Sequence, residues 1–288
     1  MNLAIASGKG GTGKTTVAVN LAHTLGDRIC LVDCDVEEPN AHLFLKGVVK
    51  HRETVTVPVP RVDPSRCDGC GDCGEFCEYN AIVPIKPAAI VFPELCHGCG
   101  GCMRVCTRGA ITETRRRIGV VETMKLANGT LVQGRLDVGV PTAPPLIKAA
   151  RASARSVSPA SEPAFTILDA PPGTSCPVVT TLQGTDFVVL VTEPTPFGLY
   201  DLRLAVEMVR KLAIPFGVVV NRAGIGDGRV HEFCARERLS ILQEIPDDRR
   251  IAEACSRGDV VVEVLPEYRD TFKLLLDNAR LTQTALQP

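Results

Sequence analysis

Residues 8–16 read Gly8-Lys9-Gly10-Gly11-Thr12-Gly13-Lys14-Thr15-Thr16. The stretch lies between a short apolar run, residues 2–6, and a segment with helical periodicity, residues 15–25. A short apolar run is consistent with a buried parallel strand. A strand, a glycine-rich loop and a helix in this order form the context in which the pattern G-x-x-x-x-G-K-[ST] binds phosphate. The sequence therefore predicts an α/β fold with a nucleotide site after its first strand.

The side chains and backbone of this loop have separate expected tasks. Backbone N–H groups surround the phosphate oxygens, and the N-terminus of the following helix adds a favourable dipole. Lys14 would reach the β- and γ-phosphates, and the Thr15 hydroxyl would coordinate Mg²⁺. The residues expected to bind nucleotide here are Gly8, Gly10, Gly11, Thr12, Gly13, Lys14, Thr15 and Thr16.

Two further apolar runs end in carboxylates. Residues 29–32 precede Asp33-Cys34-Asp35, and residues 165–168 precede Asp169. The carboxyl ends of parallel strands are where α/β folds place their sites. We therefore expect these acids beside the phosphate loop, with Asp33 supporting either magnesium or the strand end.

Lys9 gives the loop its particular character. A second lysine directly after the first glycine is the deviant Walker A pattern, and with it the chain resembles the MinD/ParA class of dimeric ATPases, which includes the nitrogenase iron protein and iron–sulfur carrier ATPases. The resemblance implies that Lys9 reaches across a dimer to the partner's phosphates. It implies that Asp35 positions the attacking water, that Asp169 holds Mg²⁺ through water, and that Gly173 senses the γ-phosphate. The implied ligands of Mg²⁺ are Thr15, Asp35 and Asp169.

The same resemblance extends to the second half of the chain. Residues 218–222 end in Asn221-Arg222, and the corresponding Asn contacts adenine in relatives. Residues 245–248 resemble the loop that closes over the base. The implied activity is hydrolysis of ATP to ADP and phosphate by in-line attack of water, assisted by positioning and charge neutralisation. Lys9, Lys14, Asp35 and Asp169 are the expected catalytic residues.

Eight of the thirteen cysteines form two runs with the same C-x2-C-x2-C-x3-C spacing. The runs are Cys67, Cys70, Cys73 and Cys77, and then Cys96, Cys99, Cys102 and Cys106. Zinc sites usually pair two C-x2-C knuckles across a longer loop, which these runs do not suit. The spacing favours iron–sulfur clusters.

The repeat resembles the bacterial two-cluster ferredoxins, in which the fourth cysteine of each run ligates the other cluster. By that resemblance one [4Fe–4S] cluster is held by Cys67, Cys70, Cys73 and Cys106. The other is held by Cys96, Cys99, Cys102 and Cys77. The chain departs from the ferredoxin pattern after each fourth cysteine, where Glu78 and Thr107 replace the usual proline.

These features divide the chain into an interrupted domain. We expect a P-loop ATPase domain in residues 1–61 and 115–288, with a two-cluster ferredoxin domain in residues 62–114. A hairpin is expected at about 118–138, because Asn128-Gly129 separates two strand-like runs. Residues 152–163 are rich in Ser, Ala and Pro and are expected to form a surface loop. The expected fold is a doubly wound, mostly parallel sheet with helices on both faces and a small ferredoxin-like insert.

Composition limits the functions further. The chain has 288 residues and a formal net charge of −1, which argues against nucleic-acid binding through a basic face. No secretory signal or bilayer-length apolar stretch is apparent, so we expect a cytoplasmic protein without stable membrane association. In that compartment dense cysteines indicate metal sites.

Three functions fit these expectations. The first is a dimeric ATP-dependent switch that couples nucleotide state to electron transfer to a protein partner. The second is a positioning or recruitment ATPase, with the clusters as a redox sensor or docking module. The third is an iron–sulfur cluster assembly or carrier ATPase, although the C-x-x-C usual at such an interface is absent outside the two runs. The dimer could be a homodimer or a heterodimer with a similar ATPase.

Overall fold

The structure is a computed structural model that describes residues 1–26, 29–157 and 165–286. Its main feature is a large sheet of nine strands within those residues, in the order β11-β10-β9-β1-β8-β2-β7-β6-β3. The strands are β1 (Asn2–Ala6), β2 (Ile29–Asp33), β3 (Val48–Val62), β6 (Ile111–Lys125), β7 (Thr130–Leu136), β8 (Phe165–Asp169), β9 (Phe187–Thr192), β10 (Phe216–Ala223) and β11 (Ile241–Pro246).

The central strands are parallel, and their register brings the site together. Strand β1 pairs in parallel with β8 and β9, and β2 pairs in parallel with β8. Asp33 lies opposite Asp169, and Ile5 lies opposite Asp169 on the other side. Both acids therefore stand at the carboxyl edge of the sheet, beside the loop that leaves β1.

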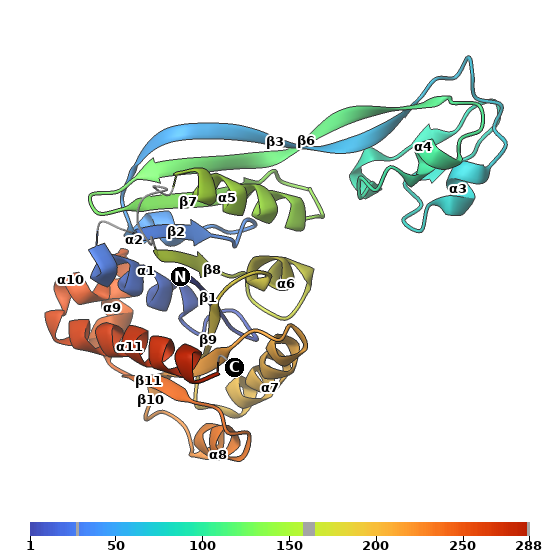
Figure 1. Ribbon diagram of the computed structural model, residues 1–288. Coiled ribbons are helices and arrows are strands. Elements are labelled where there is room, and N and C mark those ends of the chain that lie inside the picture. The colour runs from blue at the N-terminus through green and yellow to red at the C-terminus, as the bar shows by residue number, and fades with distance from the viewer. Residues whose placement is uncertain (27–28, 158–164, 287–288) are drawn as a thin grey trace. The chain divides into compact units, whose positions relative to one another are not determined.

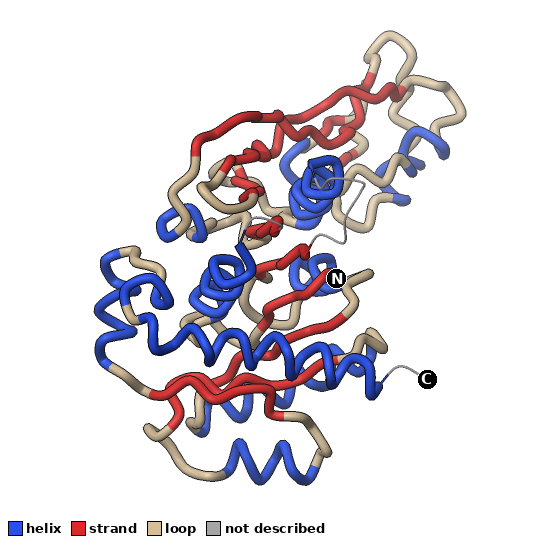
Figure 2. Tube along the Cα trace, turned by 60° about the vertical axis from the view of Figure 1, so that its left-hand side comes forward, coloured by secondary structure: helices blue, strands red, loops and turns tan. Residues whose placement is uncertain are grey.

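Helices cover both faces of the sheet in the larger part of the molecule (Figures 1 and 2). Figure 1 shows α1 and α11 on one side of the strands and α6 and α7 on the other. The helices of this part are α1 (Lys14–Leu25), α2 (Ala41–Phe44), α5 (Pro144–Val157), α6 (Cys176–Leu182), α7 (Pro196–Lys211), α8 (Arg229–Arg236), α9 (Arg249–Arg257), α10 (Val261–Val264) and α11 (Arg269–Leu286).

The core lies between the central strands and the α1/α11 layer. Leu3, Ile5 and Ile167 are fully buried, and Leu21 of α1 and Phe272 of α11 belong to the same apolar cluster. Each such side chain stabilises the fold by about 1.5–3 kcal/mol through its removal from water. Strands buried on both faces need apolar residues at successive positions, which explains the short uninterrupted apolar runs in the sequence.

The chain divides into two compact units. Unit 1 comprises residues 1–52, 121–135 and 147–288, and unit 2 comprises residues 53–120 and 136–146. Residues 62–114, the predicted insert, lie within unit 2. The smaller elements of unit 2 are α3 (Asp72–Phe76), β4 (Ile82–Val83), β5 (Ile90–Val91), a 3₁₀ turn (Pro93–Leu95) and α4 (Gly101–Val105).

Unit 2 has a small core of its own, in which buried cysteines contribute beside aliphatic residues. Its buried members are Cys73, Ile82, Ala89, Cys102 and Ile111. Strands β4 and β5 form a two-stranded antiparallel sheet beside the helices. Strand β6 begins at Ile111, seven residues before the start of the hairpin predicted at about 118–138.

The predicted loop at 152–163 is wrong over its first half. Helix α5 continues through Val157, because Ile147, Ala150 and Ala154 recur at helical spacing and are buried. Residues 158–163 of the predicted loop lie outside the described residues. None of the helices in the described ranges combines the length and apolar character that a bilayer crossing requires.

Candidate functional site

The phosphate loop connects β1 to α1 and needs its glycines. Gly11 and Gly13 have φ angles of +78° and +93°, which other residues adopt only with strain. A Cβ on Gly13 would also collide with the side-chain amide of Asn221. A Cβ on Gly8 would collide with the backbone carbonyl of Asp201. The sequence of this loop is therefore dictated by both its backbone and its close neighbours.

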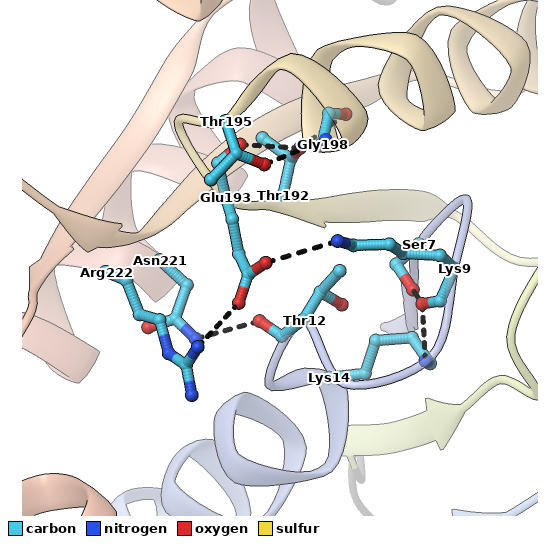
Figure 3. A network of polar contacts seen from close by, with 10 residues as sticks. All are labelled: Ser7, Lys9, Thr12, Lys14, Thr192, Glu193, Thr195, Gly198, Asn221 and Arg222. Carbon is cyan, nitrogen blue, oxygen red and sulfur yellow. Dashed lines mark hydrogen bonds and ion pairs between the residues drawn. The ribbon is translucent and has the colours of Figure 1, made fainter. Parts of the chain in front are cut away.

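Asn221 ties the end of β10 to this loop. Its Nδ2 donates a 2.8 Å hydrogen bond to the Thr12 carbonyl (Figure 3). The resemblance implied an adenine contact for Asn221, and its side chain lies at the loop in this structure. The neighbouring Arg222 has a φ of +55°, in the left-handed region. Its side chain turns to Glu193, as described below.

Thr15 and Asp169 are in direct contact. Thr15 Oγ1 donates a 2.6 Å hydrogen bond to Asp169 Oδ2. Asp169 Oδ1 is buried and has no hydrogen-bond partner among the described residues. Burial, with the nearby charge of Asp33, raises the pKa of Asp169 to about 8. A buried carboxylate oxygen without a donor, next to a threonine hydroxyl, is a donor set that suits Mg²⁺ and its water.

The charges of Lys14 and Asp35 act on each other and on the neighbouring acids. Lys14 is buried, its Nζ lies 3.5 Å from the Lys9 carbonyl, and burial lowers its pKa. Burial and the charge of Asp33 raise the pKa of Asp35 to about 6, and Lys14 opposes that shift. A buried cation flanked by Asp35 and Asp169 is the arrangement that a phosphate chain with a divalent ion would complete.

The Asp33 carboxylate accepts hydrogen bonds from the backbone of the loop that follows β2. Its Oδ1 accepts a hydrogen bond from the N–H of Asp35 at 3.1 Å. Its Oδ2 accepts from the N–H groups of Asn40 and Ala41 at 2.9 and 3.0 Å. Of the two roles left open by the sequence, these contacts correspond to support of the strand end.

Gly173 lies beside the first strand's end. Its φ is +95°, and its N–H donates a 3.1 Å hydrogen bond to the Ser7 carbonyl. The N–H expected to sense the γ-phosphate is therefore engaged within the chain here. Thr16 turns its hydroxyl toward helix α9, where its Oγ1 lies 3.6 Å from Cys255 Sγ.

The sequence analysis missed Glu193, whose carboxylate lies beside the phosphate loop. Its carboxylate lies 3.3 Å from Lys9 Nζ through Oε2 and 3.2 Å from Arg222 Nη1 through Oε1 (Figure 3). The residue is buried. One available signal was missed: Glu193 directly follows the apolar strand β9, as Asp33 and Asp169 belong to the ends of theirs.

The eight cysteines of unit 2 line two separate hollows. The larger has a volume of about 490 Å³, and its cysteines are Cys77, Cys96, Cys99 and Cys102. The smaller has a volume of about 20 Å³ and is lined by Cys67, Cys70, Cys73 and Cys106. Each hollow thus receives three cysteines of one run and the last cysteine of the other, which is the division that the ferredoxin resemblance implied.

Backbone N–H groups point at several of these sulfurs. Ala81 N–H donates to Cys77 Sγ at 3.3 Å, and Ala110 N–H donates to Cys106 Sγ at 3.3 Å. Cys67 and Cys96 also accept backbone N–H groups. Hydrogen bonds to the ligand sulfurs tune the potential of iron–sulfur clusters. Within the described ranges, no three His, Cys, Asp or Glu side chains are grouped as ligands of one metal ion.

Comparison with known proteins decides the family. The family model described as "CobQ/CobB/MinD/ParA nucleotide binding domain" (CbiA) matches residues 3–261. The chain belongs to this family. The sequence-based assignment to MinD/ParA-type P-loop ATPases is thereby confirmed.

Relatives of this CbiA-family chain include proteins that are named iron–sulfur cluster carriers. An uncharacterised protein of Methanocaldococcus jannaschii is 32% identical over 90% of this chain and 90% of its own length. The iron–sulfur cluster carrier protein of Aquifex aeolicus is 28% identical over 99% of this chain and 68% of its own length. The corresponding carrier of Pyrococcus abyssi is 26% identical over 90% of this chain and 78% of its own length.

Solved structures establish the fold of this CbiA-family member. The cell division ATPase MinD of Pyrococcus furiosus matches with a TM-score of 0.57 and 21% identity, over 97% of this chain and 98% of that one. The septum site-determining protein MinD of Pyrococcus horikoshii, complexed with Mg-ADP, matches with a TM-score of 0.58 and 21% identity, over 100% and 99% of the two chains. The predicted doubly wound, mostly parallel sheet is confirmed as a MinD-like P-loop fold.

Proposed function

We propose that this chain is an ATP-hydrolysing switch that acts as a dimer and carries two [4Fe–4S] clusters. In this proposal nucleotide state governs electron transfer to a protein partner. The observation that carries it is the pair of four-cysteine hollows in unit 2 of a chain whose unit 1 has a complete phosphate loop. We assign the ferredoxin domain to residues 62–114 and the ATPase domain to residues 1–61 and 115–288, in a cytoplasmic protein.

ATP would bind along the phosphate loop. Backbone N–H groups of the loop and the Lys14 ammonium would hold the phosphates, and Asn221 and Arg222 would border the base. Mg²⁺, when bound, would neutralise charge on the phosphates. Thr15, Asp35 and Asp169 would hold it, and the unpartnered Oδ1 of Asp169 supports this assignment.

Hydrolysis would depend on how the protein positions the attacking water and the phosphates, without a covalent intermediate on the protein. Asp35 lies at the carboxyl edge of the sheet, with its pKa raised to about 6 by burial, and would orient the attacking water. Lys9 would reach the phosphates bound by the partner in the dimer. Gly173 would exchange its bond to the Ser7 carbonyl for the γ-phosphate. ATP and ADP would thereby produce different conformations at the same site.

The four cysteines that line each hollow would hold one cluster, and the smaller hollow would widen to admit it. Backbone N–H groups at four of the eight sulfurs would donate hydrogen bonds to the ligands of a bound cluster. The two clusters, when bound, would hold and pass single electrons. The partner in the dimer could be a second copy or a similar ATPase, and M. jannaschii has two relatives of this chain.

Cluster carriage is the second candidate, because several relatives are named as iron–sulfur cluster carrier proteins. A carrier needs exchangeable ligands at an accessible surface. Outside the two runs, Cys30, Cys34 and Cys234 are buried, Cys255 is half-buried, and Cys176 is exposed. One thiol from each chain gives half of a four-thiolate site. We therefore keep electron transfer as the first proposal and cluster carriage as the second.

The test uses the full chain purified without oxygen. The clusters are reduced, and their oxidation by a one-electron acceptor is followed with and without MgATP, beside phosphate release and molar mass. The proposal expects MgATP to produce dimers and to change the oxidation rate, with both effects lost in Lys14→Ala. Transfer of the iron to an apo-acceptor protein, without a change in oxidation rate, would favour the carrier function instead. Dimerisation on MgATP without iron transfer and without a change in the oxidation rate would favour a recruitment ATPase.

A further inference from the structure

The loop after β9 holds the backbone of Glu193 in place. Thr192 Oγ1 donates a 3.0 Å hydrogen bond to the Gly198 carbonyl, and Gly198 N–H donates to Thr195 Oγ1 at 3.0 Å (Figure 3). Thr195 N–H donates in turn to the Glu193 carbonyl at 2.8 Å. A Cβ on Gly198 would collide with that carbonyl, so the turn is closely packed. Glu193 is thus presented from a rigid support.

Lys9 is the movable member of the pair with Glu193. Its backbone carbonyl accepts hydrogen bonds from Ser7 Oγ and Lys14 Nζ, so its main chain is tied to the loop. Its side chain is 32% exposed, whereas that of Glu193 is 9% exposed. A long flexible ammonium chain at the surface can leave a fixed carboxylate without any change in the backbone.

Arg222 supplies the second positive charge beside Glu193, so Lys9 can leave without isolating the buried carboxylate. A buried carboxylate that loses its only cation is strongly destabilised. Glu193 Oε1 is shielded from water and accepts no hydrogen bond within the described residues, but it lies 3.2 Å from Arg222 Nη1. Glu193 therefore keeps a counter-charge when Lys9 leaves.

We propose that Glu193 is a positioning residue that holds the Lys9 side chain within its own subunit, and that dimer formation on ATP requires Lys9 to exchange this carboxylate for the partner's phosphates. The inference rests on the proposed dimeric function. One ammonium cannot pair fully with both anions, so the two sites compete for it. The more highly charged triphosphate displaces Glu193 more readily than a diphosphate does. Glu193 thereby raises the nucleotide concentration needed for dimerisation and favours ATP over ADP.

The experiment compares the unmodified full chain with three variants. Molar mass in solution is measured across a series of concentrations of a slowly hydrolysed ATP analogue with Mg²⁺, and again with ADP. Glu193→Gln removes the charge at nearly constant shape. Lys9→Ala removes the competing ammonium, and Glu207→Gln is the matched control, because its exposed carboxylate pairs with Lys211 on α7, away from the site.

Glu193→Gln is expected to dimerise at an analogue concentration about fivefold lower than the unmodified chain, the size of effect usual for one ion pair. Glu207→Gln is expected to dimerise at the same analogue concentration as the unmodified chain. Unchanged or weaker dimerisation of a folded Glu193→Gln would overturn the inference, since a merely structural role predicts a loss. If Glu193→Gln fails to fold, Glu193→Asp keeps the charge and shortens the side chain, and a smaller shift in the same direction is expected; no shift would overturn the inference.

The Lys9→Ala variant distinguishes a failure of this inference from a failure of the proposed dimeric function. Normal dimerisation of Lys9→Ala would contradict the proposed reach of Lys9 across the dimer. Loss of dimerisation in Lys9→Ala together with no effect of Glu193→Gln would overturn the role of Glu193 alone.

Discussion

Thr15 Oγ1 donates a 2.6 Å hydrogen bond to Asp169 Oδ2, and this contact joins the first turn of helix α1 to the end of strand β8. The two residues are 154 positions apart in the chain, and unit 2 is encoded between them. The parallel pairing of β1 with β8 makes the contact possible. The two halves of the nucleotide site therefore depend on the sheet of unit 1.

The first prediction concerns the pH dependence of stability without Mg²⁺. Burial raises the pKa of Asp169 to about 8, so the folded chain keeps its proton at pH values where the unfolded chain has lost it. The free energy of unfolding should then fall as the pH rises, by about 1–2 kcal/mol between about pH 6.5 and 8. Thermal unfolding in Mg²⁺-free buffers across this pH range measures the change in the free energy of unfolding.

Asp169→Asn should remove most of that pH dependence, because the amide does not titrate. Asp270→Asn is the matched control, since Asp270 is exposed on α11 and pairs with Lys273. A slope that persists unchanged in Asp169→Asn would show that another group binds the proton.

The second prediction separates nucleotide binding from turnover. Asp35→Ala should bind MgATP with near-normal affinity and hydrolyse it about 100-fold more slowly, because the water loses its positioning group. Glu38→Gln, an exposed neighbour in the same loop, should hydrolyse ATP normally. Phosphate release and equilibrium binding provide the two readouts. Normal turnover of Asp35→Ala would show that Asp35 has no part in positioning the water.

The third prediction concerns which cysteines share a cluster. Cys70 and Cys106 line the same hollow, although they belong to different runs. The double variant Cys70→Ser/Cys106→Ser should therefore lose one cluster and keep about four iron atoms per chain. The double variant Cys99→Ser/Cys106→Ser should lose both clusters, although its two cysteines belong to one run.

Iron analysis and electron paramagnetic resonance measure the outcome. Cys176→Ser, outside both runs, should keep all the iron. The reverse pattern, in which variants within one run lose a single cluster, would mean that each run binds its own cluster.

The fourth prediction concerns the bond from Asn221 to the phosphate loop. Asn221→Ala removes the hydrogen bond to the Thr12 carbonyl and should cost about 1 kcal/mol of stability. It should also weaken MgATP binding, because the loop loses a support. Asn278→Ala is the matched control, since Asn278 Nδ2 donates a similar bond to the Leu242 carbonyl. If both variants lose the same stability and the same affinity, the bond of Asn221 has no special role in the site.

The sequence predicted what depends on local pattern. The phosphate loop, the acids Asp33, Asp35 and Asp169, and the strands before them could be located because strand ends and glycine-rich loops have short signatures. Membership of the family and the mostly parallel sheet followed from those signatures. The ligand sets of the cysteines followed from the ferredoxin resemblance, and they remain a prediction.

Features that depend on contacts between distant segments were not predicted. Glu193 follows an apolar strand as the other acids do, but only the strand order, in which β9 lies between β1 and β10, brings Lys9 and Arg222 to it. The helix through Val157 was missed because Ser and Pro nearby suggested a loop, while burial of Ala150 and Ala154 decides the conformation. In both cases tertiary packing overrides the local signal.

A redox titration tests the central claim most directly. The oxygen-free chain is titrated with and without MgATP, both clusters are followed by electron paramagnetic resonance, and Lys14→Ala serves as the control. Coupling between nucleotide and clusters predicts a shift of about 60 mV or more in at least one potential, a tenfold change for one electron, that Lys14→Ala abolishes. Two intact clusters with the same potentials and the same reduction rates in both conditions would contradict nucleotide-governed electron transfer.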